Sequence, residues 1–145
     1  MREAQVVEFL AMELKKLVGR GAKPKTLALL PELRRFADLP AEAMDPRREG
    51  MIIRRRLIQA IDSLTGQHEF YGSLIPADKL KRAYRLLFKI EGTGQGHETR
   101  RGRAITVLGM YCTVRTWRAP DGPEWQLMLL LAEHMTMPEV RQRSA

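Results

Sequence analysis

Five arginines and two threonines near the middle of the chain could bind an anion. They lie between residues 100 and 118, a stretch without Asp or Glu: Arg100, Arg101, Arg103, Thr113, Arg115, Thr116 and Arg118. A guanidinium group donates two parallel hydrogen bonds to a phosphate or to the edge of a guanine, and a threonine hydroxyl can bond either group. This combination indicates contact with nucleic acid.

Two short helices are expected to position these side chains. In the first, Thr99 is the predicted N-cap, Gly109 ends the helix, and the buried stripe consists of Ala104, Ile105 and Leu108. Thr113 is the predicted cap of the second helix, in which Val114 and Trp117 face the core. The sequence therefore predicts a helix-turn-helix at about residues 99–119. Its first helix places Arg100, Arg101 and Arg103 on phosphates, and the groove is faced by Thr113, Arg115, Thr116 and Arg118.

Residues 100–132 resemble a known segment. The shared features are paired arginines, small residues, Leu-Gly, a Thr cap, Thr-aromatic-Arg and a Leu-rich helix, represented here by Arg100-Arg101, Ala104-Ile105, Leu108-Gly109, Thr113, Thr116-Trp117-Arg118 and the run ending in Leu131-Ala132. They resemble the helix-turn-helix of small all-helical regulatory modules of GC-rich bacteria, similar to region four of sigma factors. The resemblance implies a DNA-binding fold, although such segments also occur in modules not known to touch DNA. The turn is two residues longer here, because Tyr111 and Cys112 precede Thr113.

The charge of the chain is strongly positive and unevenly distributed. The 145 residues carry a formal net charge of +8, with a pI near 10.1. Residues 76–119 contain ten Lys or Arg against three Asp or Glu, a net +7, whereas residues 120–145 have a net charge of −2. The excess favours an anionic partner, either nucleic acid or an acidic protein surface, over a small neutral substrate.

The remaining sequence predicts an all-α fold. Apolar residues at helical spacing predict helices at about 3–18, 24–39 with a restart at Pro31, 46–64 capped by Asp45, 76–90 opened by Pro76, and 123–135. Residues 66–73 and 91–98 read as loops, and residues 137–145 as a flexible tail. We expect a single-domain helical bundle of about six to seven helices over residues 1–136.

Two features of these helices allow alternative interpretations. The arginines of the helix at 46–64 form either a solvated face or an auxiliary phosphate contact: Arg47, Arg48, Arg54, Arg55 and Arg56. The helix at 123–135 is apolar almost all round, so that it lies either at the centre of the bundle or at an interface with a second chain.

Catalytic and metal-binding patterns are not evident in the sequence. His68, His97, His134 and Cys112 are scattered without metal-ligand spacing, and no nucleophile motif or paired carboxylates on one helix face are present. A single cysteine rules out an internal disulfide, and the sequence shows neither a signal peptide nor a run of about 18 apolar residues. We expect a cytoplasmic protein that is not an enzyme, has no cofactor and does not enter a membrane.

The leading functional prediction is a DNA-binding protein, a transcriptional regulator that contacts double-stranded DNA. Pairing of half-sites on DNA would favour a homodimer. The alternative is a helical adaptor in which the helix-turn-helix serves packing and the basic helix at 76–90 meets an acidic protein partner.

Overall fold

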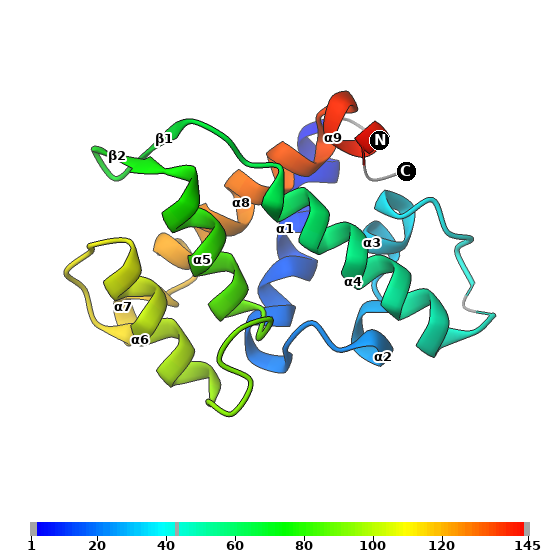
Figure 1. Ribbon diagram of the computed structural model, residues 1–145, viewed down its shortest axis with the longest axis horizontal. Helices are drawn as coiled ribbons and strands as arrows, with labels where there is room; N and C mark the ends of the chain where they lie inside the picture. Colours follow the sequence, from blue (N-terminus) through cyan, green and yellow to red (C-terminus); the bar gives the residue numbers. More distant parts are fainter. Residues whose placement is uncertain (1–2, 43, 144–145) are drawn as a thin grey trace.

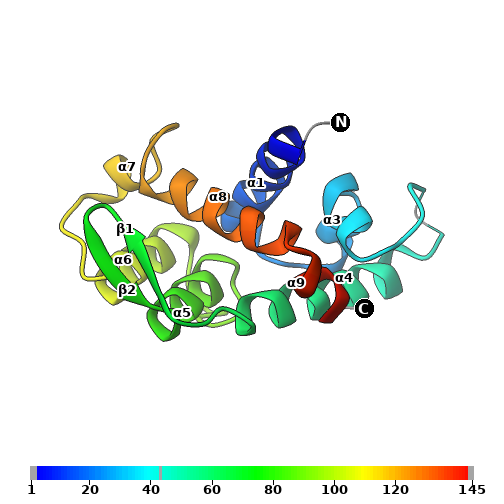
Figure 2. The same cartoon turned by 90° about the horizontal axis from the view of Figure 1, so that it is seen from above.

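The helices of the protein form two sides of an elongated body. The computed structural model describes residues 3–42 and 44–143. Helices α4 (Pro46–Asp62) and α5 (Ala77–Leu87) run along one side, and α1 (Glu3–Arg20) and α8 (Pro123–Thr136) along the other (Figures 1 and 2). The other helices are α2 (Pro24–Leu27), α3 (Pro31–Phe36), α6 (His97–Val107), α7 (Val114–Trp117) and α9 (Pro138–Arg143). The described residues are mostly helical, which confirms the all-α prediction in broad terms.

Four helices begin at the prolines that the sequence marks. Proline occupies the first turn of α2, α3, α4 and α8, where a missing N–H group costs no hydrogen bond. Asp45 caps α4, since its Oδ1 accepts a hydrogen bond from the backbone N–H of Arg48 at 3.3 Å. A less evident cap is Glu13 of α1, whose carboxylate accepts bonds of 2.9 Å from the backbone N–H groups of Glu32 and Leu33 at the start of α3.

The core is built from the apolar stripes that the sequence predicts. α1 packs along α8, and α5 packs against α6. The apolar residues Ile53, Leu57, Ala60 and Ile61 of α4 are fully buried. Five residues at and just after α5 are fully buried as well: Leu80, Ala83, Tyr84, Leu87 and Phe88. The buried hydroxyl of Tyr84 donates a 2.7 Å hydrogen bond to the carbonyl of Leu127 in α8, and burial raises the pKa of this phenol. This bond joins the two sides of the molecule.

The predicted loop at residues 66–73 is wrong in part, because a β-hairpin lies there. Strands β1 (Gln67–Phe70) and β2 (Ser73–Pro76) pair antiparallel, with Phe70 opposite Ser73. Tyr71 and Gly72 between them have φ angles of 50° and 78°, as a tight two-residue turn requires. Pro76 consequently ends β2, and α5 begins at Ala77.

Two other predicted boundaries are also wrong. α6 begins at His97 with Gly96 at its N-cap, so that Thr99 lies inside the helix. The predicted flexible tail contains α9, whose Val140 is only 3 % exposed, because this side chain packs into the core. Residues 144–145 lie outside the described residues. Among the described helices, none is long and apolar enough to cross a membrane.

Candidate nucleic-acid interface

The predicted recognition helix is a single turn. α7 contains only residues 114–117, about 6 Å of helix at 1.5 Å per residue. Thr113 caps it as predicted, with its Oγ1 accepting a 3.1 Å hydrogen bond from the backbone N–H of Thr116. Trp117 is fully buried, as predicted for a core residue. A helix of this length offers little surface to the major groove, because recognition helices reach base edges from several successive turns.

Arg101, predicted to contact phosphate, is instead part of a buried ion pair. It is 8 % exposed, and its Nε and Nη2 donate to the carboxylate of Glu124 in α8 at 2.7 and 3.2 Å. The same carboxylate accepts bonds from Lys15 at 3.2 Å and from the indole N–H of Trp117 at 3.0 Å. These bonds to Glu124 join α6, α1 and α7 to α8. The guanidinium of Arg101 is therefore not available to a phosphate.

Arg100 is turned inward as well. It is 2 % exposed, and its Nη2 and Nη1 donate to the carbonyls of Val18 at 2.7 Å and Gln95 at 2.8 Å. Burial and the neighbouring charge of Arg101 lower the pKa of this guanidinium. The bond to Val18 satisfies a carbonyl in the last turn of α1, which has no partner within its own helix. The prediction that Arg100 and Arg101 hold phosphates is therefore corrected: both are structural residues.

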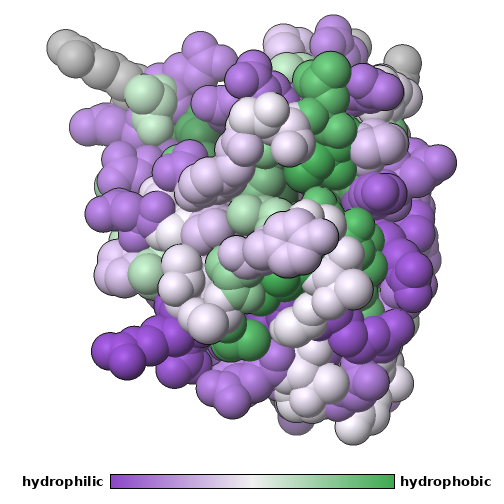
Figure 3. Space-filling view, turned by 90° about the vertical axis from the view of Figure 1, so that its left-hand side faces the viewer, coloured by the Kyte–Doolittle hydropathy of each residue, from purple (hydrophilic) through white to green (hydrophobic). Residues whose placement is uncertain are grey.

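The remaining predicted site residues lie at or near the surface. Arg103 is half-buried and donates to the side chain of Gln95 at 2.9 Å. Arg118 pairs with Glu98 at 3.3 Å, whereas Arg115 is exposed and forms no ion pair with any described carboxylate. Figure 3 views the end of the molecule that carries α6 and α7, and hydrophilic side chains surround apolar and weakly polar surface there. The predicted residues do not form one continuous basic patch.

A shallow groove between α5 and α6 contains one of these arginines. It has a volume of about 460 Å³ and is lined by Arg82, Thr99, Gly102, Arg103, Thr106 and Val107. Gly102 leaves the wall open, since a Cβ built on it would have no neighbour within 4 Å. Guanidinium and hydroxyl groups are common hydrogen-bond donors to the phosphates of a nucleic-acid backbone, and this groove offers two of each. The charge is reduced by Glu91, which lies 3.9 Å from Arg82.

The largest set of arginines without carboxylate partners is on α4. Arg47, Arg48, Arg54 and Arg55 recur at spacings of one, six or seven and eight residues, which places them on one face of the helix, opposite Ile53 and Leu57. We call these four residues the α4 stripe. None of them forms an ion pair with a carboxylate of the described residues. Arg54 is half-buried and the other three are exposed.

The two acidic residues within α4, Glu49 and Asp62, pair with arginines that do not belong to the stripe. Glu49 is held by Arg34 at 2.8 Å, and hydrogen bonds from the backbone of Asp45, from Arg34 and from the backbone of Met44 hold the pKa of this carboxyl below its usual value. Asp62 is paired with Arg85 of α5 at 2.6 Å. Between the arginines, Met51 is 57 % exposed. The outer face of α4 is therefore cationic, with an apolar side chain at its centre.

Tyr111 is an exposed aromatic residue outside the predicted set of contacts. It is completely exposed in the loop between α6 and α7, four residues before Arg115. Exposed aromatic rings next to arginines stack on bases of single-stranded nucleic acid. The signal was present in the sequence, because Tyr111 belongs to the two residues by which the turn exceeds the resembled pattern.

In comparisons with known proteins, no family model, no curated protein and no solved structure matches this chain. The functional assignment therefore depends on the side chains described above.

Proposed function

We propose that the protein binds double-stranded DNA through the phosphate backbone, with the α4 stripe as its main contact. The observation that carries this proposal is four arginines on one helix face without a carboxylate partner among the described residues. Surface arginines without partners keep their full charge for an incoming anion, and binding releases the counterions condensed on DNA.

The dimensions of the stripe fit a DNA backbone. From Arg47 to Arg55 the helix rises about 12 Å at 1.5 Å per residue. One DNA strand places a phosphate about every 3.4 Å along the helix axis, so that this length spans roughly three to four phosphates. The exposed Met51 lies within the stripe and can contact sugar carbons between the phosphates. Contacts of this kind fix the position of a protein on DNA without reading its sequence.

The role of a sequence-specific transcriptional regulator is a separate part of the proposal. It would require Arg115, Thr116 and Arg118 to read base edges from the one-turn helix α7. Replacing Arg115 and Arg118 with Ala tests it. If these residues read bases, the variant loses its preference for a selected DNA site. If they contact only phosphates, affinity falls by a similar factor for every sequence.

Fluorescence anisotropy with a labelled random-sequence DNA duplex tests the contact by the α4 stripe. The double variant Arg54→Gln/Arg55→Gln should bind more weakly, and the slope of log K against log salt should become shallower by about 0.9 for each phosphate that the variant no longer neutralises. The matched control is Lys16→Gln/Arg20→Gln on α1, which removes the same charge from two exposed residues without ion pairs among the described residues. The proposal is wrong if the wild type does not bind at low salt, or if both variants lose affinity equally.

A further inference from the structure

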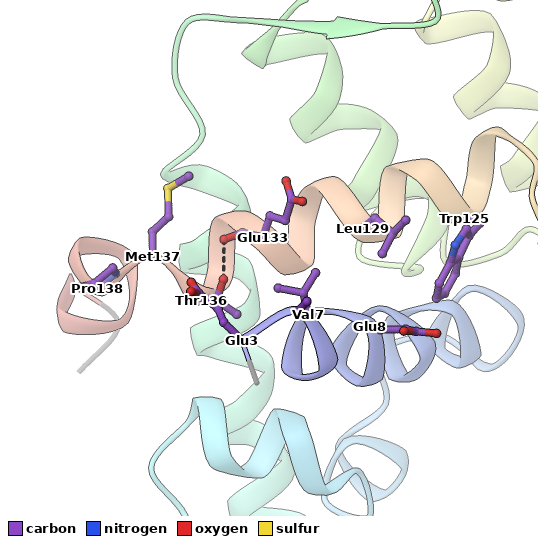
Figure 4. Close-up of a pocket in the computed structure, with 10 residues that line it drawn as sticks. Glu3, Val7, Glu8, Trp125, Leu129, Glu133, Thr136, Met137 and Pro138 are labelled. Carbon is purple, nitrogen blue, oxygen red and sulfur yellow. Dashed lines mark hydrogen bonds between the residues drawn. The ribbon is translucent and has the colours of Figure 1, made fainter. Parts of the chain in front are cut away.

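A groove between α1, α8 and the start of α9 has no role in the proposed contact with DNA. Its volume is about 700 Å³, and residues from the first turns of α1, from the length of α8 and from the beginning of α9 line it. Figure 4 shows Val7 of α1 and Trp125 and Leu129 of α8 pointing into the space between the two helices. The groove thus follows two neighbouring helices.

The floor of the groove is apolar and only partly covered. Val7, Trp125 and Leu129 are half-buried, although all three pack against the hydrophobic core. Met137, which follows α8, is 45 % exposed at the end of the groove. This explains the apolar character of α8, which the sequence left open: one face fills the core, and part of the opposite face lines a surface groove.

The border of the groove is acidic. Glu3, Glu8 and Glu133 line it, all three are exposed, and none forms an ion pair with a described cation. Among the residues that the structure describes, no Lys or Arg belongs to the lining. In a chain with a net charge of +8, this is a local reversal of sign. Charge complementarity therefore selects a cationic occupant.

We infer that the groove binds a cationic amphipathic helix of a partner protein. Apolar side chains at i, i+3 or i+4, and i+7 of such a helix would occupy the floor between Val7, Trp125 and Leu129, and flanking Lys or Arg would meet the three glutamates. This is the opposite of the adaptor predicted from sequence, in which a basic helix of this chain meets an acidic partner.

A second copy of the chain is a poor occupant when the groove pairs with itself. A two-fold symmetric contact places the same surface on both sides of the interface, so that six carboxylates would face one another. Like charges in such an arrangement oppose association. An amphipathic helix bearing Lys or Arg brings the complementary charge.

A designed peptide can serve as the probe. It is about 15 residues long, or roughly four helical turns, with leucines at i, i+3, i+4 and i+7 and lysines elsewhere. Two control peptides carry glutamate in place of lysine, or the same residues in scrambled order. Binding to the full chain is measured by calorimetry and by the fluorescence of Trp125, whose environment the peptide changes, whereas Trp117 is already fully buried.

The expected result is saturable binding of the lysine peptide alone, with a change in Trp fluorescence. The variant Glu8→Lys/Glu133→Lys should weaken this binding by about tenfold, because two attractions become repulsions. The matched control is Glu69→Lys on the exposed side of β1, and Leu129→Ala should weaken binding without changing the surface charge.

The inference is overturned if no peptide binds at 100-fold excess, if the glutamate or scrambled peptide binds equally well, or if Glu69→Lys has the same effect as the groove variant. Light scattering without added peptide tests the alternative occupant. If the protein dimerises as its concentration rises, and if Glu8→Lys/Glu133→Lys changes this dimerisation, the groove binds a second copy and the inference is also overturned. DNA affinity is measured on the same variants, and since the α4 stripe lies on another helix, failure of one proposal leaves the other intact.

Discussion

At the scale of single residues, the buried carboxylate of Glu124 in α8 is bonded to side chains from three other helices. It accepts hydrogen bonds from Arg101, Lys15 and Trp117, which come from three different elements. A charge removed from water is stable only when partners of opposite charge and hydrogen bonds replace its hydration. Arg101, which the sequence suggested for phosphate binding, and the core residue Trp117 thus both serve to satisfy one acidic residue.

The variant Glu124→Gln should destabilise the protein by about 3–5 kcal/mol, because it leaves the charge of Arg101 buried without a counter-charge. Urea unfolding at neutral pH measures the effect. As a control, Glu69→Gln on the exposed side of β1 should change the free energy of unfolding by less than about 0.5 kcal/mol. A loss below about 1 kcal/mol in Glu124→Gln would show that the ion pair contributes little.

His134 makes stability depend on pH. Its Nε2 lies 2.7 Å from the hydroxyl of Ser63 and 3.1 Å from the carbonyl oxygen of Ala60. Because a carbonyl oxygen can only accept a hydrogen bond, we infer that Nε2 carries the proton of the neutral ring. Burial lowers the pKa of His134 below its ordinary value of 6.5, an effect that the bond to Ala60 opposes. The unfolded chain then binds the proton more readily, and stability present above about pH 6.5 is lost as the pH falls.

The replacement His134→Gln should therefore flatten the fall in the free energy of unfolding between about pH 7 and pH 5. Glu13 acts in the opposite sense. Burial raises the pKa of its carboxyl, so its contribution to the free energy of unfolding is lost as the pH rises. Comparing wild type and variant by urea unfolding at each pH removes the effect of Glu13, because both proteins contain it. Parallel pH profiles would contradict the role of His134.

At the scale of elements, contact between α2 and α4 depends on a glycine. A Cβ at Gly50 would lie 1.8 Å from the carbonyl oxygen of Pro24, which is backbone and cannot turn aside. The two helices approach this closely because glycine has no side chain. The contact fixes where α4, and with it the α4 stripe, sits on the core.

Gly50→Ala should accordingly destabilise the protein by about 1–3 kcal/mol or more, as overpacking does. Gly102→Ala offers the matched comparison within a helix, because nothing lies within 4 Å of its Cβ. Alanine there should stabilise the protein by about 0.5–1 kcal/mol, since it restricts the unfolded chain and favours α6. Thermal unfolding followed by circular dichroism measures both changes, and equal effects of the two substitutions would contradict the packing of α2 on α4.

At the scale of the whole molecule, the distribution of charge distinguishes two surfaces. The outer face of α4 is cationic, and the groove between α1 and α8 is acidic. Figure 2 shows α4 on the opposite side of the molecule from α1. Two surfaces of opposite charge on opposite sides would let the protein hold DNA and a cationic helix at the same time.

The affinity for DNA should fall steeply with salt. Neutralisation of four phosphates by the α4 stripe gives a slope of about −3.6 for log K against log salt, so that raising salt from 50 to 200 mM weakens binding roughly 150-fold. Anisotropy titrations of the wild type at several salt concentrations measure the slope. A slope near zero would show that phosphate contacts do not carry the binding, whatever its affinity.

The sequence by itself determined where most helices begin and which apolar residues they bury. Prolines and Asp45 act through local backbone chemistry, and stripes such as Ile53, Leu57 and Ile61 follow from helical geometry. The hairpin was missed because its strands are only four residues long, too short for a clear alternation of polar and apolar residues. The net positive charge is equally a property of the sequence.

Only the tertiary structure decided which charged residues are free to bind a partner. Arg101 lies four residues before Ile105 and seven before Leu108, on the predicted buried face of its helix. A buried arginine is stable only beside a partner of opposite charge. That partner is Glu124, which is 23 residues away in the chain. The acidic groove likewise depends on α1 and α8, which lie at opposite ends of the sequence. Pairings at such separations are set by packing of the whole chain, because no local pattern records which distant helix will be the neighbour.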